Sequence, residues 1–304
     1  MEWRGKRKSN NVDDRRGSQP LAFGGSGGGA SLLRFLPVVY RFLGFKGTAI
    51  LVVCVGGYGL LSGNLGSMLG NAGIQTSQSS RLPNQEVQQT SEEKEQVDFV
   101  SVVLADTEQT WTDIFKQQGQ VYQEPKLVLF RNSVKSACGM GQAAMGPFYC
   151  PGDQQVYIDL SFFDQLKNQF KAPGDFAQAY VIAHEVGHHI QTITGTSTKV
   201  RAAKSKVSEI EGNKLSVKQE LQADCYAGVW AYHANTQRNM LENGDVEEGL
   251  RAATAIGDDT LQKQSQGHVS PDSFTHGSSE QRVKWFKIGI ENGDVNLCDT
   301  FAND

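Results

Sequence analysis

Apolar residues recur with helical spacing in several parts of this chain, and two short stretches alternate as strands do. Residues 97–118 have the helical spacing, whereas Lys126–Arg131 and Gln155–Leu160 are typical of strands. From Ser161 onwards the pattern again predicts mostly helices. A few strands followed by packed helices predict a mostly helical α+β domain with a small sheet over residues 97–304.

Two stretches of this domain follow neither periodicity. Ser136–Asp153 contains four glycines and two prolines, and Gly257–Gly277 is a long interruption among the predicted helices. Both stretches predict loops, because glycine and proline interrupt regular structure and a helix needs an apolar face to pack.

The N-terminal third has a different pattern. No charged residue occurs between Lys46 and Arg81, and Gly47–Leu69 is long and apolar enough to predict one transmembrane helix. A buried glycine-rich core helix is the alternative. Residues 1–46 then form a separate basic segment, and residues 70–96, rich in Ser, Gln, Asn and Glu, form a polar linker.

The charge distribution orients this predicted span. Residues 1–46 carry nine Lys/Arg and three acidic residues, a net of +6; subtracting these from totals of 29 and 33 leaves 20 and 30, a net of −10. Excess positive charge before a span predicts a cytoplasmic N-terminus and a single-pass protein whose domain lies outside, in contact with the lipid bilayer. The acidic remainder argues against binding of nucleic acid.

The cysteines are consistent with an exported domain. Cys54 lies within the predicted span, and the other four form an even set that allows three pairings. We favour Cys138–Cys150 with Cys225–Cys298, because the first pair closes a short loop rich in glycine and proline. No two cysteines form a CxxC pair, which argues against a cysteine zinc site.

The clearest chemical signal is HEVGH at residues 184–188. Asp175 as an N-cap, with Gln178 three residues later, and Gly195 at the other end predict a helix around it. On a helix, His184 and His188 lie one turn apart on the same face and can share a zinc ion. Glu185 lies beside them and can act as the general base on a zinc-bound water.

Gly187 costs helix stability of about 1 kcal/mol relative to alanine, which indicates that another segment approaches closely there. His189 points to another side of the helix, so packing or exposure to solvent is expected rather than metal binding. Two surface histidines and a glutamate in an ion pair are the alternative interpretation of the whole motif.

Catalytic zinc keeps three protein ligands and one open position, so a third ligand and one Zn²⁺ per chain are expected. Gln191 and Thr194 exclude the metzincin extension, which requires Gly and His there. The remaining candidates are Glu209, Glu211 and Glu220. The first two have polar surroundings, which favours Glu220.

Glu220 and Asp224 share one face of a predicted helix that has Ser216 as a possible N-cap. One carboxylate can then bind zinc while Asp224 accepts a hydrogen bond from a ligand histidine. The small residues Ala223, Ala227 and Gly228 favour close packing of this helix. An exposed position on a helix is the alternative for Glu220.

His276 is the candidate donor to the oxyanion of the reaction. It precedes a helix whose capping box is Ser278 with Gln281, so a fixed turn can direct it into a cleft. A loop histidine bonded to backbone is the alternative. Arg282, one turn into that helix, is a candidate partner for Asp224.

Gln155–Leu160 is a candidate edge strand that holds an extended peptide substrate by backbone pairing, with residues 146–151 bordering the cleft. An ordinary internal strand is an equal alternative.

Several longer motifs resemble the YpfJ-like family of bacterial neutral zinc metallopeptidases. The shared stretches are WRG and NVDDRR near the start, then CGMGQAAMGPFYCPGDQQVYIDL, HEVGHHIQ, ELQADCYAGVW and FTHGSSEQRVKWF. The resemblance covers nearly the whole chain. It implies a zincin-like peptidase domain, a protein or peptide substrate, and a place in the bacterial inner membrane with the catalytic domain in the periplasm.

HExxH followed by Glu-x-x-x-Asp and a later Thr-His is also similar, more distantly, to the CAAX-protease-like gluzincins. This implies His184, His188 and Glu220 as ligands, Glu185 as base, and supporting roles for Asp224 and His276. The chain departs from that pattern at Gly277, where those enzymes usually have proline, and in having one predicted span.

The sequence is compatible with two functions. The first is an exported zinc endopeptidase, and the second is a catalytically silent zinc-binding membrane scaffold. A fourth His or Cys at the metal favours the scaffold, whereas an intact Glu185 favours catalysis, because a structural site needs no base.

Overall fold

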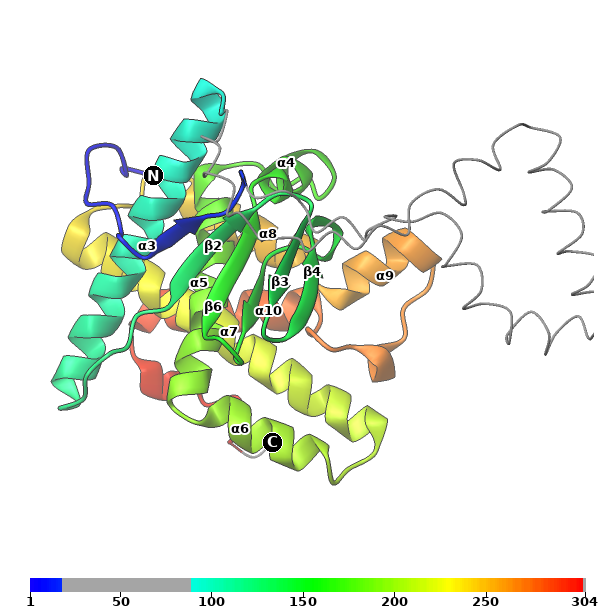
Figure 1. Ribbon diagram of the computed structural model, residues 1–304. Helices are drawn as coiled ribbons and strands as arrows, with labels where there is room; N and C mark the ends of the chain where they lie inside the picture. The colour runs from blue at the N-terminus through cyan, green and yellow to red at the C-terminus, as the bar shows by residue number, and fades with distance from the viewer. Residues whose placement is uncertain (18–88, 303–304) are drawn as a thin grey trace, which may run out of the picture. The chain divides into compact units, whose positions relative to one another are not determined.

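The computed structural model describes residues 1–17 and 89–302, which form one folded unit (Figure 1). The strands are β1 (Val12–Asp14), β2 (Lys126–Phe130), β3 (Ser133–Ser136), β4 (Gly139–Gln142), β5 (Phe148–Cys150) and β6 (Gln155–Asp159). The helices are α3 (Ser91–Gln117), α4 (Ser161–Asn168), α5 (Asp175–Ile193), α6 (Thr196–Lys204), α7 (Glu209–Arg238), α8 (Asp245–Ala255), α9 (Asp258–Gln266) and α10 (Ser279–Asn292), with 3₁₀ turns η1 (Ala143–Met145), η2 (Pro271–Ser273) and η3 (Val295–Cys298). The predicted mostly helical α+β class is confirmed.

The main sheet has the strand order β1-β2-β6-β5. β1, β2 and β6 are parallel, and β5 is antiparallel to β6. The apolar run of β2 is buried on both faces, and α5 packs against β5 and β6 (Figure 1). β6 is therefore an internal strand, so of the two alternatives for Gln155–Leu160 the internal strand is the one observed.

Both predicted loops contain regular structure. Residues 136–153 include β4, which forms a hairpin with the preceding β3, and also η1 and the edge strand β5. Residues 257–277 include α9 and η2. The edge strand nearest to α5 is thus β5, three residues long and bordered by Pro147 and Pro151, which hide the alternation that identifies a strand from sequence.

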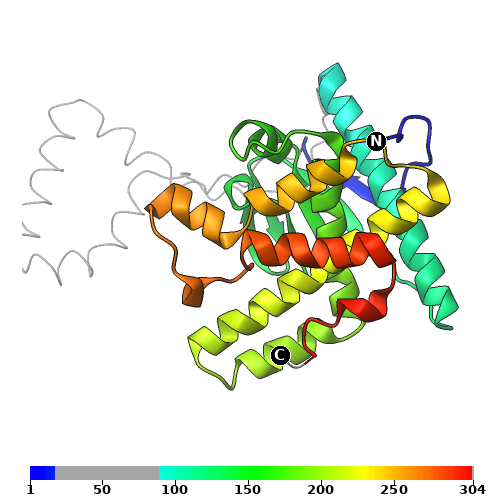
Figure 2. The same cartoon turned by 180° about the vertical axis from the view of Figure 1, so that it is seen from behind.

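Helices α5, α7 and α10 pack closely behind the sheet. Figure 2 shows α7 and α10 lying side by side. A Cβ on Gly228 of α7 would lie 2.2 Å from the carbonyl oxygen of Phe286, and one on Gly289 of α10 would lie 2.1 Å from that of Cys225. A Cβ on Gly187 of α5 would lie 3.0 Å from the Ala223 oxygen of α7. The predicted close approach at Gly187 is confirmed, and it brings α5 and α7 together at the HEVGH motif.

The N-terminal residues belong to this unit rather than to a separate segment. Val12 pairs with Leu127 in the sheet, the Ser9 amide donates to the Ser101 carbonyl, and Trp3 is buried. Paired strands lie about 5 Å apart, so β1 is an integral part of this domain.

The boundaries within the N-terminal region also change. The domain helix α3 begins at Ser91, where Thr90 and Glu93 form a capping box, rather than at Val97. No helix within residues 1–17 and 89–302 is long and apolar enough to cross a membrane. The predicted span Gly47–Leu69, and Cys54 within it, lie outside the described residues.

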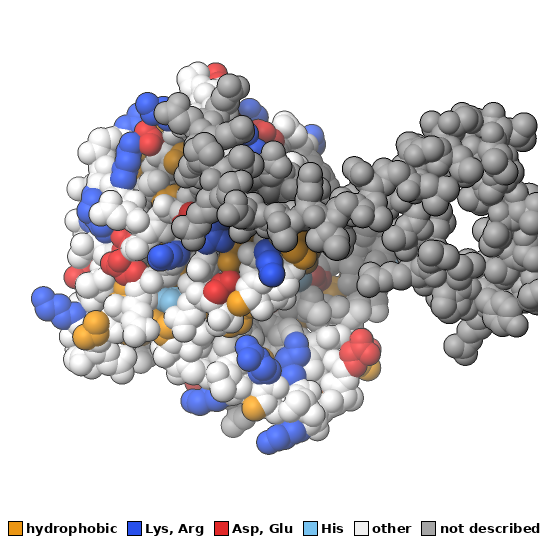
Figure 3. Space-filling model, in the orientation of Figure 1, with side chains coloured by type: hydrophobic (Ala, Val, Ile, Leu, Met, Phe, Trp, Pro, Cys, Tyr) orange, Lys and Arg blue, Asp and Glu red, His pale blue; other side chains and the backbone are white. Residues whose placement is uncertain are grey.

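Strand β1 forms the outer edge of the sheet and is short and charged. Asp13 pairs with Arg15 at 2.7 Å, and Asp14 pairs with Arg16 at 2.7 Å. Acidic and basic side chains are interspersed over the face seen in Figure 3. Charge on an edge strand discourages pairing with other chains.

The structure forms both favoured disulfides. Cys138–Cys150 joins the β3–β4 turn to the end of β5, and Cys225–Cys298 joins α7 to η3. The first bond fixes the edge strand near α5, and the second fixes the chain's last described turn against the helix that carries Glu220.

Candidate metal centre and active site

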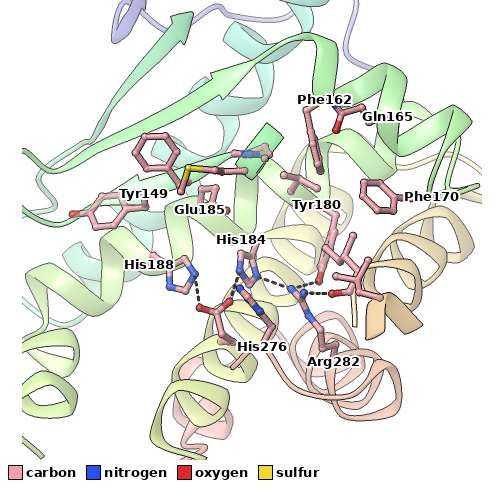
Figure 4. Close-up of a pocket in the computed structure, with 18 of the residues that line it drawn as sticks. Tyr149, Phe162, Gln165, Phe170, Tyr180, His184, Glu185, His188, His276 and Arg282 are labelled. Atoms are coloured by element: carbon pink, nitrogen blue, oxygen red, sulfur yellow. Dashed lines mark hydrogen bonds and ion pairs between the residues drawn. The ribbon is translucent and has the colours of Figure 1, made fainter. Parts of the chain in front are cut away.

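Helices α5 and α7 bring three candidate ligands to one point (Figure 4). Nε2 of His184 lies 3.2 Å from Oε2 of Glu220, and Nε2 of His188 lies 3.4 Å from Oε1 of Glu220. Donor atoms of all three residues lie within 4.8 Å of one another. The convergence of the three predicted ligands is present in the structure.

Hydrogen bonds fix both imidazoles with Nε2 facing this point. Nδ1 of His184 donates to Oδ1 of Asp224 at 2.8 Å, as predicted, and Nδ1 of His188 donates to Oε1 of Gln191 at 2.9 Å. The amide nitrogen of Gln191 donates to the Gln219 carbonyl at 2.6 Å, which holds its oxygen toward His188. Both Nε2 lone pairs are thus available to a metal, and two imidazoles with one carboxylate fit Zn²⁺.

Asp224 is fully buried and lies at the centre of a charged network. Nε and Nη2 of Arg282 donate to its two oxygens at 2.8 and 2.9 Å, which confirms the predicted pair. The hydroxyl of Tyr180 also donates to Asp224. Burial opposes ionisation of Asp224, but the charges of Arg282 and His184 outweigh it and lower its pKa to about 2.

The same contacts make the ligand cluster attractive to a cation. Burial favours neutral Glu220, but the charge of His188 and the hydrogen bond from His184 hold the Glu220 pKa well below its usual value. Burial lowers the pKa of His184, yet the charge and hydrogen bond of Asp224 raise it to about 10. A proton and a metal ion compete for the same Nε2 lone pair, so a site that holds a proton this firmly also favours a metal cation.

Glu185 is positioned for a different role from that of the ligands. It is 8% exposed and lines the same cavity as His184 and His188. Within the described part of the chain no group hydrogen-bonds to its carboxylate. That carboxylate is free to accept a proton from a water molecule in the cavity.

The cavity beside the ligands has a volume of about 460 Å³. One wall consists of residues 144–149, which lead into β5, and His276 and Arg282 lie on the side of α10. A cavity of this size holds several side chains of an extended peptide.

His276 lines this cavity and is held by a residue that sequence reasoning missed. Asp258, the first residue of α9, accepts hydrogen bonds from the backbone amides of Thr275, His276 and Gly277 and from Nδ1 of His276 at 3.2 Å. The hydrogen bond that His276 donates to Asp258 is the main cause of a raised His276 pKa. The predicted capping box of Ser278 and Gln281 follows directly.

Several details near the site differ from prediction. The N-cap of α5 is Gly174 rather than Asp175, and the Asp175 carboxylate instead binds the Met1 amine at 3.1 Å. Helix α7 begins with Ser208 as its N-cap, so Ser216 lies inside the helix. A side chain needs the correct turn as well as the correct spacing to cap a helix, and the local sequence does not specify that turn.

Other acids and histidines lie where they were expected. Glu209 and Glu211 are exposed in the first turn of α7, away from the ligands. His189 is buried on another side of α5, where its Nε2 donates to the Gln123 carbonyl at 2.6 Å and its Nδ1 accepts from the Tyr149 hydroxyl at 3.1 Å. Its expected packing role is confirmed.

Two nitrogen donors, one carboxylate and an adjoining cavity are the arrangement of mononuclear zinc hydrolases. The chain belongs to the family described as "Putative neutral zinc metallopeptidase", whose model matches residues 1–301. The resemblance drawn from the motifs is therefore confirmed, and the family supports a zinc peptidase that acts on a peptide or protein.

Two groups of relatives extend this result. The uncharacterized protein YpfJ of Escherichia coli strain K12 is 48% identical over 304 residues, which cover 99% of each chain. The uncharacterized proteins Mb2605 of Mycobacterium bovis and Rv2575 of Mycobacterium tuberculosis strain H37Rv are each 43% identical over 191 residues, covering 60% of this chain and 64% of theirs. No solved structure matches.

Proposed function

We propose that the protein is a zinc-dependent endopeptidase of the zincin-like, gluzincin type, with His184, His188 and Glu220 as ligands. The observation that carries the proposal is the convergence of these three side chains beside Glu185, whose carboxylate has no hydrogen-bond partner among the described residues. When bound, zinc polarises the scissile carbonyl and lowers the pKa of water.

The protein's own residues supply the remaining steps. Glu185 accepts the proton of the attacking water and delivers it to the leaving amine. His276, held by Asp258, donates a hydrogen bond to the oxyanion that develops on the substrate. The backbone of β5 is the sheet edge nearest to α5, and an extended peptide can pair with it.

The site favours catalysis over a silent scaffold. A closed structural zinc site has four protein ligands. Within residues 1–17 and 89–302 no fourth His or Cys joins the cluster of His184, His188 and Glu220. The open side faces the cavity instead, where a substrate can approach.

Metal removal tests the proposal directly. We expect the full chain in detergent to cleave casein, to lose cleavage after treatment with a chelator, and to regain it when about one equivalent of Zn²⁺ per chain is added. Atomic absorption measures the metal and fluorescent casein measures the cleavage. Cleavage that survives complete metal removal contradicts the proposal.

The contact between Asp258 and His276 predicts a pH dependence. Because Nδ1 of His276 donates to Asp258, Nε2 carries a proton only in the imidazolium form. The raised pKa keeps this form present above the ordinary value of about 6.5, and the donor is lost as the pH rises through the raised pKa. We expect Asp258→Asn to shift the alkaline limb of kcat to lower pH.

A pH profile of kcat from 5 to 9 measures this shift. The exposed Asp272 in η2 provides the control, because Asp272→Asn changes a carboxylate of the same region without touching His276. An alkaline limb that stays in place in Asp258→Asn removes the assigned role of His276.

We propose further that the domain faces the periplasm of a bacterial inner membrane. Two disulfides suit an oxidising compartment, and the pairing of β1 with β2 keeps residues 1–17 in that same compartment. The proposal therefore places the N-terminus on the periplasmic side, in place of the cytoplasmic N-terminus expected from the charge distribution.

Labelling with a membrane-impermeant maleimide tests this arrangement. In a chain that carries Cys54→Ala, Lys8→Cys and Glu291→Cys each place an exposed thiol, one on the N-terminal segment and one on α10. We expect both thiols to react in intact spheroplasts. Reaction of only one contradicts the shared side, and reaction of neither before lysis contradicts export.

A further inference from the structure

One half of the active-site cavity is apolar. Its lining comes from α4, α5, α9 and the segments that follow α4 and α8: Phe162, Phe170, Val181, Ile256 and Leu261. The rings of Phe162 and Phe170 lie 6.2 Å apart, and the Ile256 carbonyl accepts from Arg282 at 3.2 Å. Figure 4 shows Phe162, Phe170 and Tyr180 together on the side of the cavity away from Tyr149.

Part of this apolar half is exposed to solvent and can be covered by a ligand. Phe170, Ile256 and Leu261 are each only partly buried, although each lines the cavity. The guanidinium of Arg282 is committed to Asp224, and the polar side chain among these apolar neighbours, Gln165, is uncharged. The chemistry that fits such a surface is a large apolar side chain.

The direction of β5 assigns this half to one side of the scissile bond. Before β5, a Cβ on Gly146 would lie 3.4 Å from the Phe162 ring, so the strand begins at the apolar half. Tyr149 in β5 and Pro151 just after the strand border a second hollow, which His188 also lines. β5 therefore runs from the apolar half, past the ligands, toward that hollow.

An antiparallel peptide on this edge runs in the opposite direction, and antiparallel pairing is the more stable kind. Its residues after the scissile bond then lie over the apolar half, and those before the bond lie toward His188 and Pro151. Val181, one turn before His184 and Glu185 on α5, places this half directly beside the reacting atoms.

We infer that the protein selects its cleavage site by a large apolar side chain, such as Leu, Ile, Phe or Met, on the residue that follows the scissile bond. This inference rests on the proposed peptidase function. An apolar pocket discriminates by about 10–200-fold per methylene. We therefore expect kcat/KM for a leucine peptide to exceed that of the matched glycine or glutamate peptide by at least about 100-fold.

The test uses the full chain and a peptide series that differs only at this position, carrying Leu, Phe, Ala, Gly or Glu. Leu261→Arg places a cation in the apolar half without altering a ligand or Glu185. It should lower kcat/KM for the leucine peptide at least about 10-fold and raise that for the glutamate peptide. Leu297→Arg, at a position 48% exposed in η3, is the matched control and should leave the preference unchanged.

Binding provides a readout that depends on neither turnover nor folding of a variant. Two peptide hydroxamates, one with an isobutyl and one with a carboxymethyl group at this position, are titrated into the zinc-loaded wild-type protein by calorimetry. Tighter binding of the isobutyl compound by at least about 10-fold supports the inference.

The possible outcomes distinguish the peptidase activity from the apolar preference for the residue after the scissile bond. Cleavage that requires Glu185 but is indifferent to the varied residue overturns the apolar pocket and leaves the peptidase assignment intact. An isobutyl preference without any cleavage supports the pocket and overturns hydrolysis. Absence of both cleavage and zinc-dependent hydroxamate binding overturns both.

Discussion

Replacing Glu185 with glutamine is expected to reduce peptide cleavage by about 10²–10⁴-fold while about one zinc ion per chain remains bound. Glutamine keeps the shape of the side chain but cannot accept a proton from water. Glu185 makes no hydrogen bond to His184, His188 or Glu220, so its replacement leaves the ligand cluster unchanged. Cleavage of fluorescent casein and zinc content, measured on the same preparation, check both parts.

Glu209→Gln is the matched control for this experiment. Glu209 is exposed in the first turn of α7, so the change has the same chemistry far from the cavity. We expect wild-type cleavage and zinc content from it. Equal cleavage by the Glu185→Gln protein would falsify the general base, and absence of metal from all three proteins would remove the site itself.

Replacing Glu220 with glutamine is expected to weaken zinc binding by more than about 100-fold, and cleavage falls with it. Glu220 is the one carboxylate among the three ligands, and it lies within 3.4 Å of both imidazoles. Loss of an outer partner of a ligand costs about 10–100-fold in metal affinity, so loss of the ligand itself should cost more. Competition with a fluorescent zinc chelator measures the affinity.

Two further variants of α7 serve as controls for the effect of Glu220→Gln on zinc affinity. Asp224→Asn changes the outer partner of His184 and should weaken zinc binding by about 10–100-fold. Glu211→Gln changes an exposed acid of the same helix and should have no effect. If Glu220→Gln binds zinc as tightly as Glu211→Gln does, the third ligand has been assigned wrongly.

The core of the site was predictable because its constraints are local. His184 and His188 are one turn apart on a helix whose apolar neighbours are evident, and Glu220 with Asp224 repeats that spacing on a second helix. Gly187 signalled the point at which the two helices meet. Each of these inferences needed only helical geometry and the chemistry of zinc.

The supporting residues were not predictable to the same extent, because their roles depend on tertiary contacts. Tyr180 and Gln191 had a usable signal, since they lie four residues before His184 and three after His188 on the same helix. Asp258 had none, because it begins α9, a short polar helix without an apolar face. Its partner His276 lies 18 residues later, beyond the reach of any local pattern.

The sheet shows the same division between local and distant constraints. β2 and β6 are apolar runs that indicate strands directly. β1 contains one apolar residue and two aspartates, and only its long-range pairing with β2 makes it a strand. Parallel pairing between segments so far apart leaves no mark in the local sequence.

The place of β1 at the sheet edge has a practical consequence for solubility. Without it, the apolar run KLVLF of β2 would present an unpaired edge to other copies, and such segments promote aggregation. A truncated protein that starts at the predicted boundary, Val97, lacks this cover. Residues 1–17 therefore protect the protein from self-association. They have to be retained in any fragment prepared for crystallisation or assay.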